Sequence, residues 1–235
     1  MNNLYLNDAY LKEQKTIVEQ QRVVKKKTAV VLKDNIFYPS GGGQIFDTGN
    51  LVVENKTIFV TRIVKIDGYS WLCLDTKDNL PEGTDVMSEI DWERRYRFMK
   101  SHTAAHLVMG AIKRNVADYS PEGIEINEEC NIELRFAGDW DASEQSANNV
   151  IQISNETINK NLSVYAEDFS DINNAVGKHQ HIFRGSTNFS GNIRIVVIED
   201  WDANPCGGTH VKNTNELSEI ELVEFSKHTF IVRLK

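Results

Sequence analysis

The sequence predicts an α+β protein with two parts. A small β-barrel-like domain is expected over residues 1–90, and residues 91–235 are expected to form a domain with a mainly antiparallel sheet packed on helices. Three observations predict this fold. Short stretches rich in β-branched and aromatic residues, separated by turn-type residues, fill the first part. A long helical pattern begins at Asp91. The longest apolar runs are strand-sized, well short of the ~20 residues of a membrane helix, so no membrane partner is expected.

Six strands are expected in the first part, and the motif Asp67-Gly68 is a two-residue hairpin turn between the last two of them. Closely spaced short strands of this kind are typical of a small barrel or sandwich. Leu80–Gly83 contains proline and glycine and ends this part, which places the domain boundary near residue 90. The expected strands are Tyr5–Leu11, Thr16–Lys26, Lys27–Asp34, Asn50–Glu54, Lys56–Ile66 and Tyr69–Asp75.

In the second part, apolar and small residues recur with a helical period over Asp91–Ala117, which predicts a long helix. A second helix is expected at Asp141–Asn161, where Asp141 and Ser143 mark the start. The sheet strands are expected at Ile132–Phe136, Leu162–Asp168, Ile193–Glu199, Ser218–Ser226 and Thr229–Leu234.

The formal net charge is −8, but the acidic residues are concentrated in one segment. Residues 121–175 hold twelve acidic and two basic residues, so a basic face elsewhere remains compatible with a nucleic-acid partner. Three cysteines are an odd number without framework spacing, which argues against a disulfide scaffold. The N-terminus has no secretory signal pattern, and the expected compartment is the cytoplasm.

Two pairs of potential metal ligands stand out. His102 and His106 are four residues apart in the long predicted helix, so both side chains share one face. A zincin metalloprotease is excluded, because its general-base glutamate would occupy the position of Thr103. Cys206 and His210 are also four apart, with two glycines between them that permit a tight backbone path. Three imidazoles and one thiolate fill a tetrahedral shell of the kind that Zn²⁺ prefers.

The segment Gly41-Gly42-Gly43-Gln44 is the other unusual stretch. It lacks the Gly-Lys-Ser/Thr ending of a Walker A loop and the spacing of a dinucleotide-binding motif. A flexible hairpin loop is the simpler interpretation. Three consecutive glycines are nevertheless costly to order, and they are usually found where a ligand or another backbone approaches closely. We therefore favour a functional loop that presents Gln44.

Together, the motifs Tyr38–Gln44, His102–His106 and Cys206–His210 resemble the editing domain of alanyl-tRNA synthetase, and still more its free-standing AlaX relatives. The resemblance implies a cytoplasmic zinc-dependent aminoacyl-tRNA deacylase that removes serine, and in some members glycine, from the acceptor end of tRNA(Ala). The length of the chain favours the free-standing, medium-length form. By position, the two histidines of the second motif and the Cys and His of the third become zinc ligands. Gln44 and Thr103 become active-site residues.

Several alternatives stay open at this stage. Four ligands exceed the three that a catalytic zinc usually has, which leaves three possibilities: one residue is absent from the shell, the metal expands to five ligands, or the metal only orients the substrate. The hydroxyl of Thr103 can distinguish serine from alanine by a hydrogen bond, or it can bond a backbone carbonyl one helical turn back. Other candidate functions are a threonyl-type editing deacylase and a non-catalytic RNA-binding module with structural zinc. Basic residues expected to contact tRNA phosphates are Arg94, Arg97, Lys100, Lys25 and Lys26.

Overall fold

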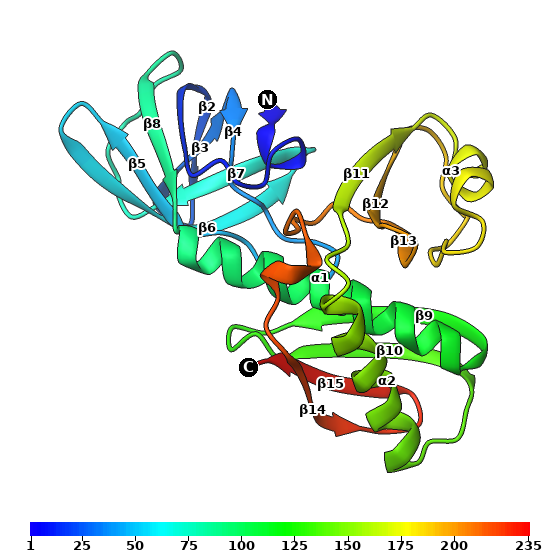
Figure 1. Cartoon of the computed structure of the whole chain (residues 1–235). Helices are drawn as coiled ribbons and strands as arrows, with labels where there is room; N and C mark the ends of the chain where they lie inside the picture. Colours follow the sequence, from blue (N-terminus) through cyan, green and yellow to red (C-terminus); the bar gives the residue numbers. More distant parts are fainter. The chain divides into compact units, whose positions relative to one another are not determined.

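The computed structural model describes all 235 residues and divides into two compact units (Figure 1). The first unit comprises Met1–Gly41 and Ile45–Arg97, and the second comprises Gly42–Gln44 and Phe98–Lys235. The contacts therefore divide the chain slightly after the expected position, and they assign three residues of the glycine-rich segment to the second unit. None of the helices combines the length and the apolar character that a membrane-spanning segment requires.

The first unit is a closed barrel of six antiparallel strands in the order β2-β3-β7-β6-β5-β8. Its interior is a continuous apolar cluster that includes Val30, Leu32, Leu72 and Leu74, all fully buried. The strands are β2 (Glu13–Val24), β3 (Lys27–Leu32), β5 (Gly49–Val53), β6 (Lys56–Ile66), β7 (Tyr69–Leu74) and β8 (Asp85–Ile90); β1 (Asn2–Asn3), the 3-10 helix η1 (Leu4–Leu6) and β4 (Asp34–Asn35) precede or connect them.

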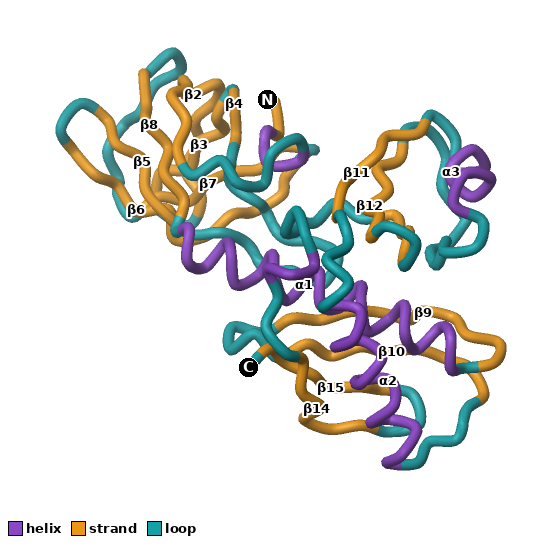
Figure 2. The backbone as a smooth tube through the Cα atoms, in the orientation of Figure 1, coloured by secondary structure: helices purple, strands orange, loops and turns teal.

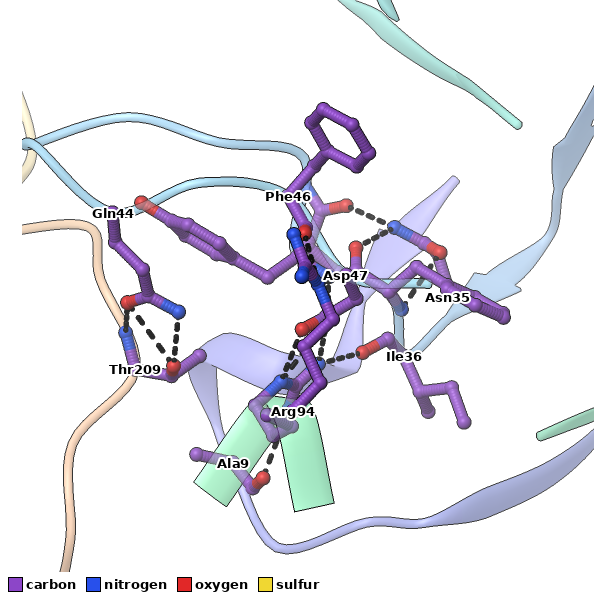
Figure 3. Close-up of polar contacts among 12 residues, drawn as sticks. Ala9, Asn35, Ile36, Gln44, Phe46, Asp47, Arg94 and Thr209 are labelled. Atoms are coloured by element: carbon purple, nitrogen blue, oxygen red, sulfur yellow. Dashed lines mark hydrogen bonds and ion pairs between the residues drawn. The ribbon is translucent and has the colours of Figure 1, made fainter. Parts of the chain in front are cut away.

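A hairpin turn and a buried ion pair show how the sequence shapes this unit. Asp67 and Gly68 join β6 to β7 with φ angles of 53° and 80°, the left-handed conformation that a two-residue hairpin turn of this type requires. Arg95 is fully buried and its Nε lies 3.0 Å from both carboxylate oxygens of Asp47. The same guanidinium donates to the backbone carbonyls of Ala9 at 2.9 Å and Ile36 at 2.6 Å (Figure 3). These contacts satisfy a buried charge that would otherwise be costly.

The second unit contains two antiparallel sheets and the helices packed on them (Figure 1). The four-stranded sheet has the order β14-β15-β10-β9, and the three-stranded sheet has the order β11-β12-β13. Figure 2 distinguishes the strands, in orange, from the helices, in purple. Helices α1 and α2 lie along the larger sheet, and α3 lies beside the smaller one. The elements are α1 (Trp92–Asn115, which begins in the first unit), β9 (Ala117–Ile126), β10 (Ile132–Asp139), α2 (Glu144–Ile158), β11 (Val164–Phe169), α3 (Ile172–His179), β12 (Ile193–Ile198), β13 (Asp202–Pro205), the 3-10 helix η2 (Thr214–Glu216), β14 (Ile220–Phe225) and β15 (Thr229–Leu234).

The predicted fold class is confirmed, since the structure has a barrel and mainly antiparallel sheets packed on helices. The strand predicted at Tyr5–Leu11 is wrong. Residues Leu4–Leu6 form a 3-10 helix, and the side chain of Asp8 accepts a hydrogen bond from the backbone of Tyr10 at 3.1 Å, so a local turn replaces the strand. The sequence analysis also missed β8, which closes the barrel by pairing with β2 and β5.

Two strands and one α-helix of the second unit were also missed. Strand β9 contains Pro121 and Gly123, which resemble loop residues, but the strand lies at the edge of its sheet, where proline is tolerated. Helix α3 has only eight residues, and its start depends on Asp171, whose side chain accepts from the backbone N–H of Asn173. Strand β13 has four residues, too few for a recognisable alternation.

Candidate metal centre

Helix α1 brings polar side chains into the interior of the second unit. Every residue from Ser101 to Ile112 is buried, including His102, Thr103 and His106. Because His102 and His106 are one helical turn apart, their rings lie together, with centroids 5.4 Å apart. Buried polar groups need partners, so the partners of these rings determine what the site can do.

The loop after β13 adds the second pair of ligands. Gly208 lies against His102, and a Cβ atom at this position would be 2.2 Å from Cε1 of the ring, so a side chain cannot be accommodated. This close approach places the Sγ of Cys206 3.6 Å from Nε2 of His102 and 3.4 Å from Nε2 of His210. The four ligand atoms, including one from His106, all lie within 4.8 Å of one another. The group can hold one metal ion.

Each histidine is oriented by a hydrogen bond at Nδ1. The partner of His102 is Oε1 of Gln44 at 3.0 Å, and the partner of His106 is Oδ2 of Asp202 at 2.9 Å. A neutral imidazole that donates from Nδ1 has an unprotonated Nε2, which is the form that binds a metal. Nε2 of His106 is buried and has no hydrogen-bond partner. An orphaned acceptor beside a thiol and two further imidazoles fits a metal ion, and three nitrogens with one sulfur suit zinc.

Thr103 orients the third imidazole. Its Oγ1 donates to the backbone carbonyl of Met99 at 2.9 Å and lies 3.1 Å from Nδ1 of His210. The backbone N–H of Val211 donates to the same oxygen at 3.3 Å. A hydroxyl has one donor and two acceptor positions, and these three contacts use all of them. The hydroxyl therefore fixes the ring of His210, and the bond to the carbonyl one turn back is present.

The surroundings of Cys206 and His210 favour the protonation states that bind a metal. Burial alone would raise the pKa of Cys206, but the adjacent His102 and His210 lower it well below its usual value, which favours the thiolate. Burial and the neighbouring His102 lower the pKa of His210 to about 3, so its ring is neutral near pH 7. Burial would raise the pKa of Asp202, yet the charge of Arg184 lowers it to about 2.

Arg184 and Asp202 form a buried ion pair behind the site. Nε of Arg184 donates to Oδ1 of Asp202 at 2.8 Å, and NH2 donates to Oδ2 at 3.1 Å. The side chains are 2% and 1% exposed, so a partner for each charge is required. Asp202 thus connects an arginine to His106 and holds the imidazole by a carboxylate. The sequence analysis missed both residues, because neither belongs to a motif with a recognisable spacing.

The glycine-rich segment reaches the same site. The backbone N–H of Ile126 in β9 donates to the carbonyl of Gly43 at 3.0 Å. A Cβ on Gly43 would lie 2.2 Å from the carbonyl oxygen of Ile124, and φ is +84°, so this position requires glycine. The segment then places Gln44 against the ligand loop, where its carboxamide bonds the hydroxyl and the backbone N–H of Thr209 (Figure 3). The three glycines thus allow the backbone of this loop to lie close to the backbone of β9, as the sequence analysis expected for such a segment.

A pocket of ≈ 410 Å³ opens beside the four ligands within the second unit. His102, His106 and Cys206 line one part of it, together with Gly42 and Gly43. The remaining wall is mostly apolar and comes from β9, α1, β13 and the segment after α3; it includes Met109, Pro121, Ile124, Phe189 and Pro205. A concave, largely apolar pocket with a few converging polar groups is typical of a small-molecule or reactive site.

The structure brings together the four ligands expected from the sequence. Gln44 and Thr103 also lie at the site, but neither lines the pocket, and both are almost completely buried. The carboxamide of Gln44 contacts His102, and the hydroxyl of Thr103 contacts His210. A direct contact with substrate stays a prediction for both residues, whereas a role in orienting the imidazoles follows from the hydrogen bonds.

The basic residues expected to contact tRNA differ in exposure. Arg94 is 9% exposed, and its Nε donates to the backbone carbonyl of Phe46 at 3.2 Å in the first unit (Figure 3). Lys25 and Lys26 are exposed and form the turn between β2 and β3 with positive φ angles. Two others also belong to α1; Arg97 is exposed in the first unit and Lys100 is half-buried in the second. Contacts with tRNA stay a prediction.

Comparisons with known proteins connect this geometry to a family. The model for the second additional domain of threonyl and alanyl tRNA synthetases matches residues 193–234, which include the loop with Cys206 and His210. The model for class II (A) tRNA synthetases matches residues 7–94. The alanyl-tRNA editing protein AlaX-L of Pyrococcus horikoshii is 31% identical over 97% of this chain and 55% of its own length. Nearly the whole chain is thus similar to an alanyl-tRNA editing protein.

Alanine–tRNA ligases are similar to the same extent. The ligase of Aeropyrum pernix is 32% identical over 91% of this chain and 24% of its own length. The ligase of Sulfurisphaera tokodaii is 30% identical over 95% of this chain and 24% of its own length. The chain thus spans about a quarter of these ligases and about half of the AlaX-L protein. The similarity to these proteins covers nearly the whole chain.

Proposed function

We propose that the protein is a cytoplasmic zinc-dependent deacylase that removes serine, and also glycine, from mischarged tRNA(Ala). The observation that carries this proposal is the cluster of Cys206 and three imidazoles. Their ligand atoms lie within 4.8 Å of one another, and the Nδ1 of each imidazole is hydrogen-bonded. The printed name of the AlaX-L relative, an alanyl-tRNA editing protein, supports the substrate class. Hydrolysis of the aminoacyl ester releases the amino acid and a tRNA with a free ribose hydroxyl.

The residues of the chain would prepare the site for this reaction. When bound, zinc supplies Lewis acidity for polarising an ester carbonyl. Gln44, Asp202 and Thr103 hold the three imidazoles and so preserve the shape of the cluster. Gly42 and Gly43 line the pocket without side chains, which leaves room for a ribose and its ester beside the ligands.

The test is deacylation of serine-charged tRNA(Ala) by the full chain, with and without a zinc chelator. Cys206→Ala is expected to abolish stoichiometric metal binding and to reduce hydrolysis strongly, because the thiolate is one of four ligands. Cys73→Ala is the matched control, since this thiol is buried in the barrel and lies outside the cluster. It should retain metal and activity. Full hydrolysis by a metal-free sample would contradict zinc dependence. Hydrolysis of the substrates of a threonyl-type editing deacylase, in place of serine-charged tRNA(Ala), would contradict the proposed substrate.

A further inference from the structure

Glu122 lies at an irregularity in strand β9. Across the ladder with β10, Arg135 pairs with Gly123 and the next residue, Phe136, pairs with Pro121. Glu122 is therefore the extra residue of a β-bulge and has no partner on the neighbouring strand. Bulges redirect side chains and are over-represented next to active sites. The carboxylate is exposed and takes part in no hydrogen bond or ion pair.

The same residue lines the pocket beside the metal ligands. It is the one carboxylate of that lining. The other permanently charged side chain is Arg184, whose guanidinium is occupied by the buried carboxylate of Asp202. Glu122 is therefore the one permanently charged side chain of the lining whose charge no neighbouring side chain compensates, and its charge is negative. An anionic group in a pocket selects a cationic part of a ligand.

We propose that Glu122 binds the α-ammonium group of the aminoacyl ester, an inference that rests on the proposed function. An aminoacyl-tRNA differs from an ordinary ester by a positively charged amine one carbon from the reactive carbonyl. A pocket built around a divalent cation repels this amine, and the carboxylate compensates for the repulsion with a charge-assisted hydrogen bond. Glu122 thus selects an aminoacyl group with a free amine over acyl groups that lack one.

The first experiment compares Glu122→Gln with Glu125→Gln. Glu125 lies on the same strand, but its carboxylate lies 3.6 Å from Arg135 and does not line the pocket. Substrates are serine-charged tRNA(Ala) with a free amine and the same tRNA with an N-acetylated serine. We expect Glu122→Gln to lower kcat/KM about tenfold for the free amine, the size typical of one hydrogen bond to a charged group. The N-acetylated substrate should be hydrolysed equally by both variants and by the original protein.

Two results would overturn the inference. An equal loss on both substrates would mean that Glu122 acts on water or supports the site, and no loss on either would mean that it contacts neither. Metal content, measured by mass spectrometry of the native protein, should be unchanged in both variants. Loss of metal in Glu122→Gln would assign the residue to the metal centre and would also overturn the inference.

A binding measurement separates this inference from the proposed function. The probe is an adenosine whose 3′-linked serine is attached through a stable amide, with its amine either free or acetylated. Calorimetry with the zinc-loaded protein should show tighter binding of the free amine, and Glu122→Gln should remove that preference. If the protein hydrolyses no aminoacyl-tRNA, the proposed function fails while this preference can still be measured. Equal binding of both probes would overturn the role of Glu122 even where hydrolysis is intact.

Discussion

The contact between Asp202 and His106 leads to a prediction about metal affinity. In Asp202→Asn, one carboxylate oxygen becomes an NH₂ group. Both oxygens face donors, because Oδ1 accepts from Arg184 and Oδ2 accepts from Arg184 and from His106. Either orientation of the amide therefore opposes a donor to a donor. The variant loses at least one hydrogen bond and leaves the charge of Arg184 uncompensated.

The magnitudes of the two effects differ. Loss of a carboxylate that orients a metal-binding histidine typically costs 10- to 100-fold in metal affinity, or about 1.4–2.8 kcal/mol. Removal of one partner of a buried ion pair costs about 3–5 kcal/mol of folding stability. Asp202 is 1% exposed and contacts Arg184 and His106, so both effects are expected. For a chain of this size, that loss lowers Tm by roughly 10 °C.

The assay is a competition between the protein and a chromophoric zinc chelator, combined with the Tm of the metal-free protein. Asp200→Asn is the control, because this residue is exposed and lies in the turn before β13. It should change neither quantity. A variant of Asp202 that binds zinc as tightly as the original chain would refute the reasoning, since the carboxylate would then serve the ion pair alone. An unchanged Tm would refute the energetic importance of that pair.

Three further predictions concern the groups around the ligands. Gln44→Ala should weaken zinc binding about tenfold in the same competition assay, because one imidazole loses its acceptor; unchanged affinity would restrict the carboxamide to another role. Thr103→Val should lower both Tm and zinc affinity, since the Nδ1–H of His210 loses its partner at a cost of about 1–3 kcal/mol; if only the preference for serine over alanine falls, the hydroxyl contacts substrate. Gly43→Ala should lower Tm more than Gly68→Ala. The two glycines have similar φ angles of +84° and +80°, but only a Cβ on Gly43 would meet a neighbouring atom within 4 Å. Equal losses of Tm would exclude the contact with Ile124 as the cause.

Local sequence signals predicted those parts of the fold that depend on neighbouring residues. The long helix and the hairpin at Asp67-Gly68 are examples, because periodicity and turn chemistry act over a few positions. Strands β8 and β9 could not be predicted in this way. The first is recognisable by its pairing with β2 and β5, and the second contains a proline that only an edge position tolerates.

The candidate site shows the same division. The four-residue spacing predicted the two ligand pairs. Their convergence on one site was predicted because three imidazoles and one thiolate together suit a single zinc ion. The partners of the imidazoles do not. Asp202 contacts His106 only because β13 pairs with β12 and turns into the ligand loop, and the importance of Glu122 depends on a bulge in β9. Contacts of this kind depend on tertiary register, which a single sequence does not display.

The assignment of Gly42–Gln44 to the second unit has a consequence for the order of folding. Gln44 and Thr209 are 165 residues apart in the chain, and Cys206 and His102 are 104 residues apart. Contacts between such distant positions form late, because long loops must close first. During synthesis, the pair in α1 emerges long before its thiolate partner and can bind an ion only weakly. Tight metal binding therefore requires the chain to be synthesised at least as far as His210 and to bring the glycine-rich segment, α1 and the loop after β13 together.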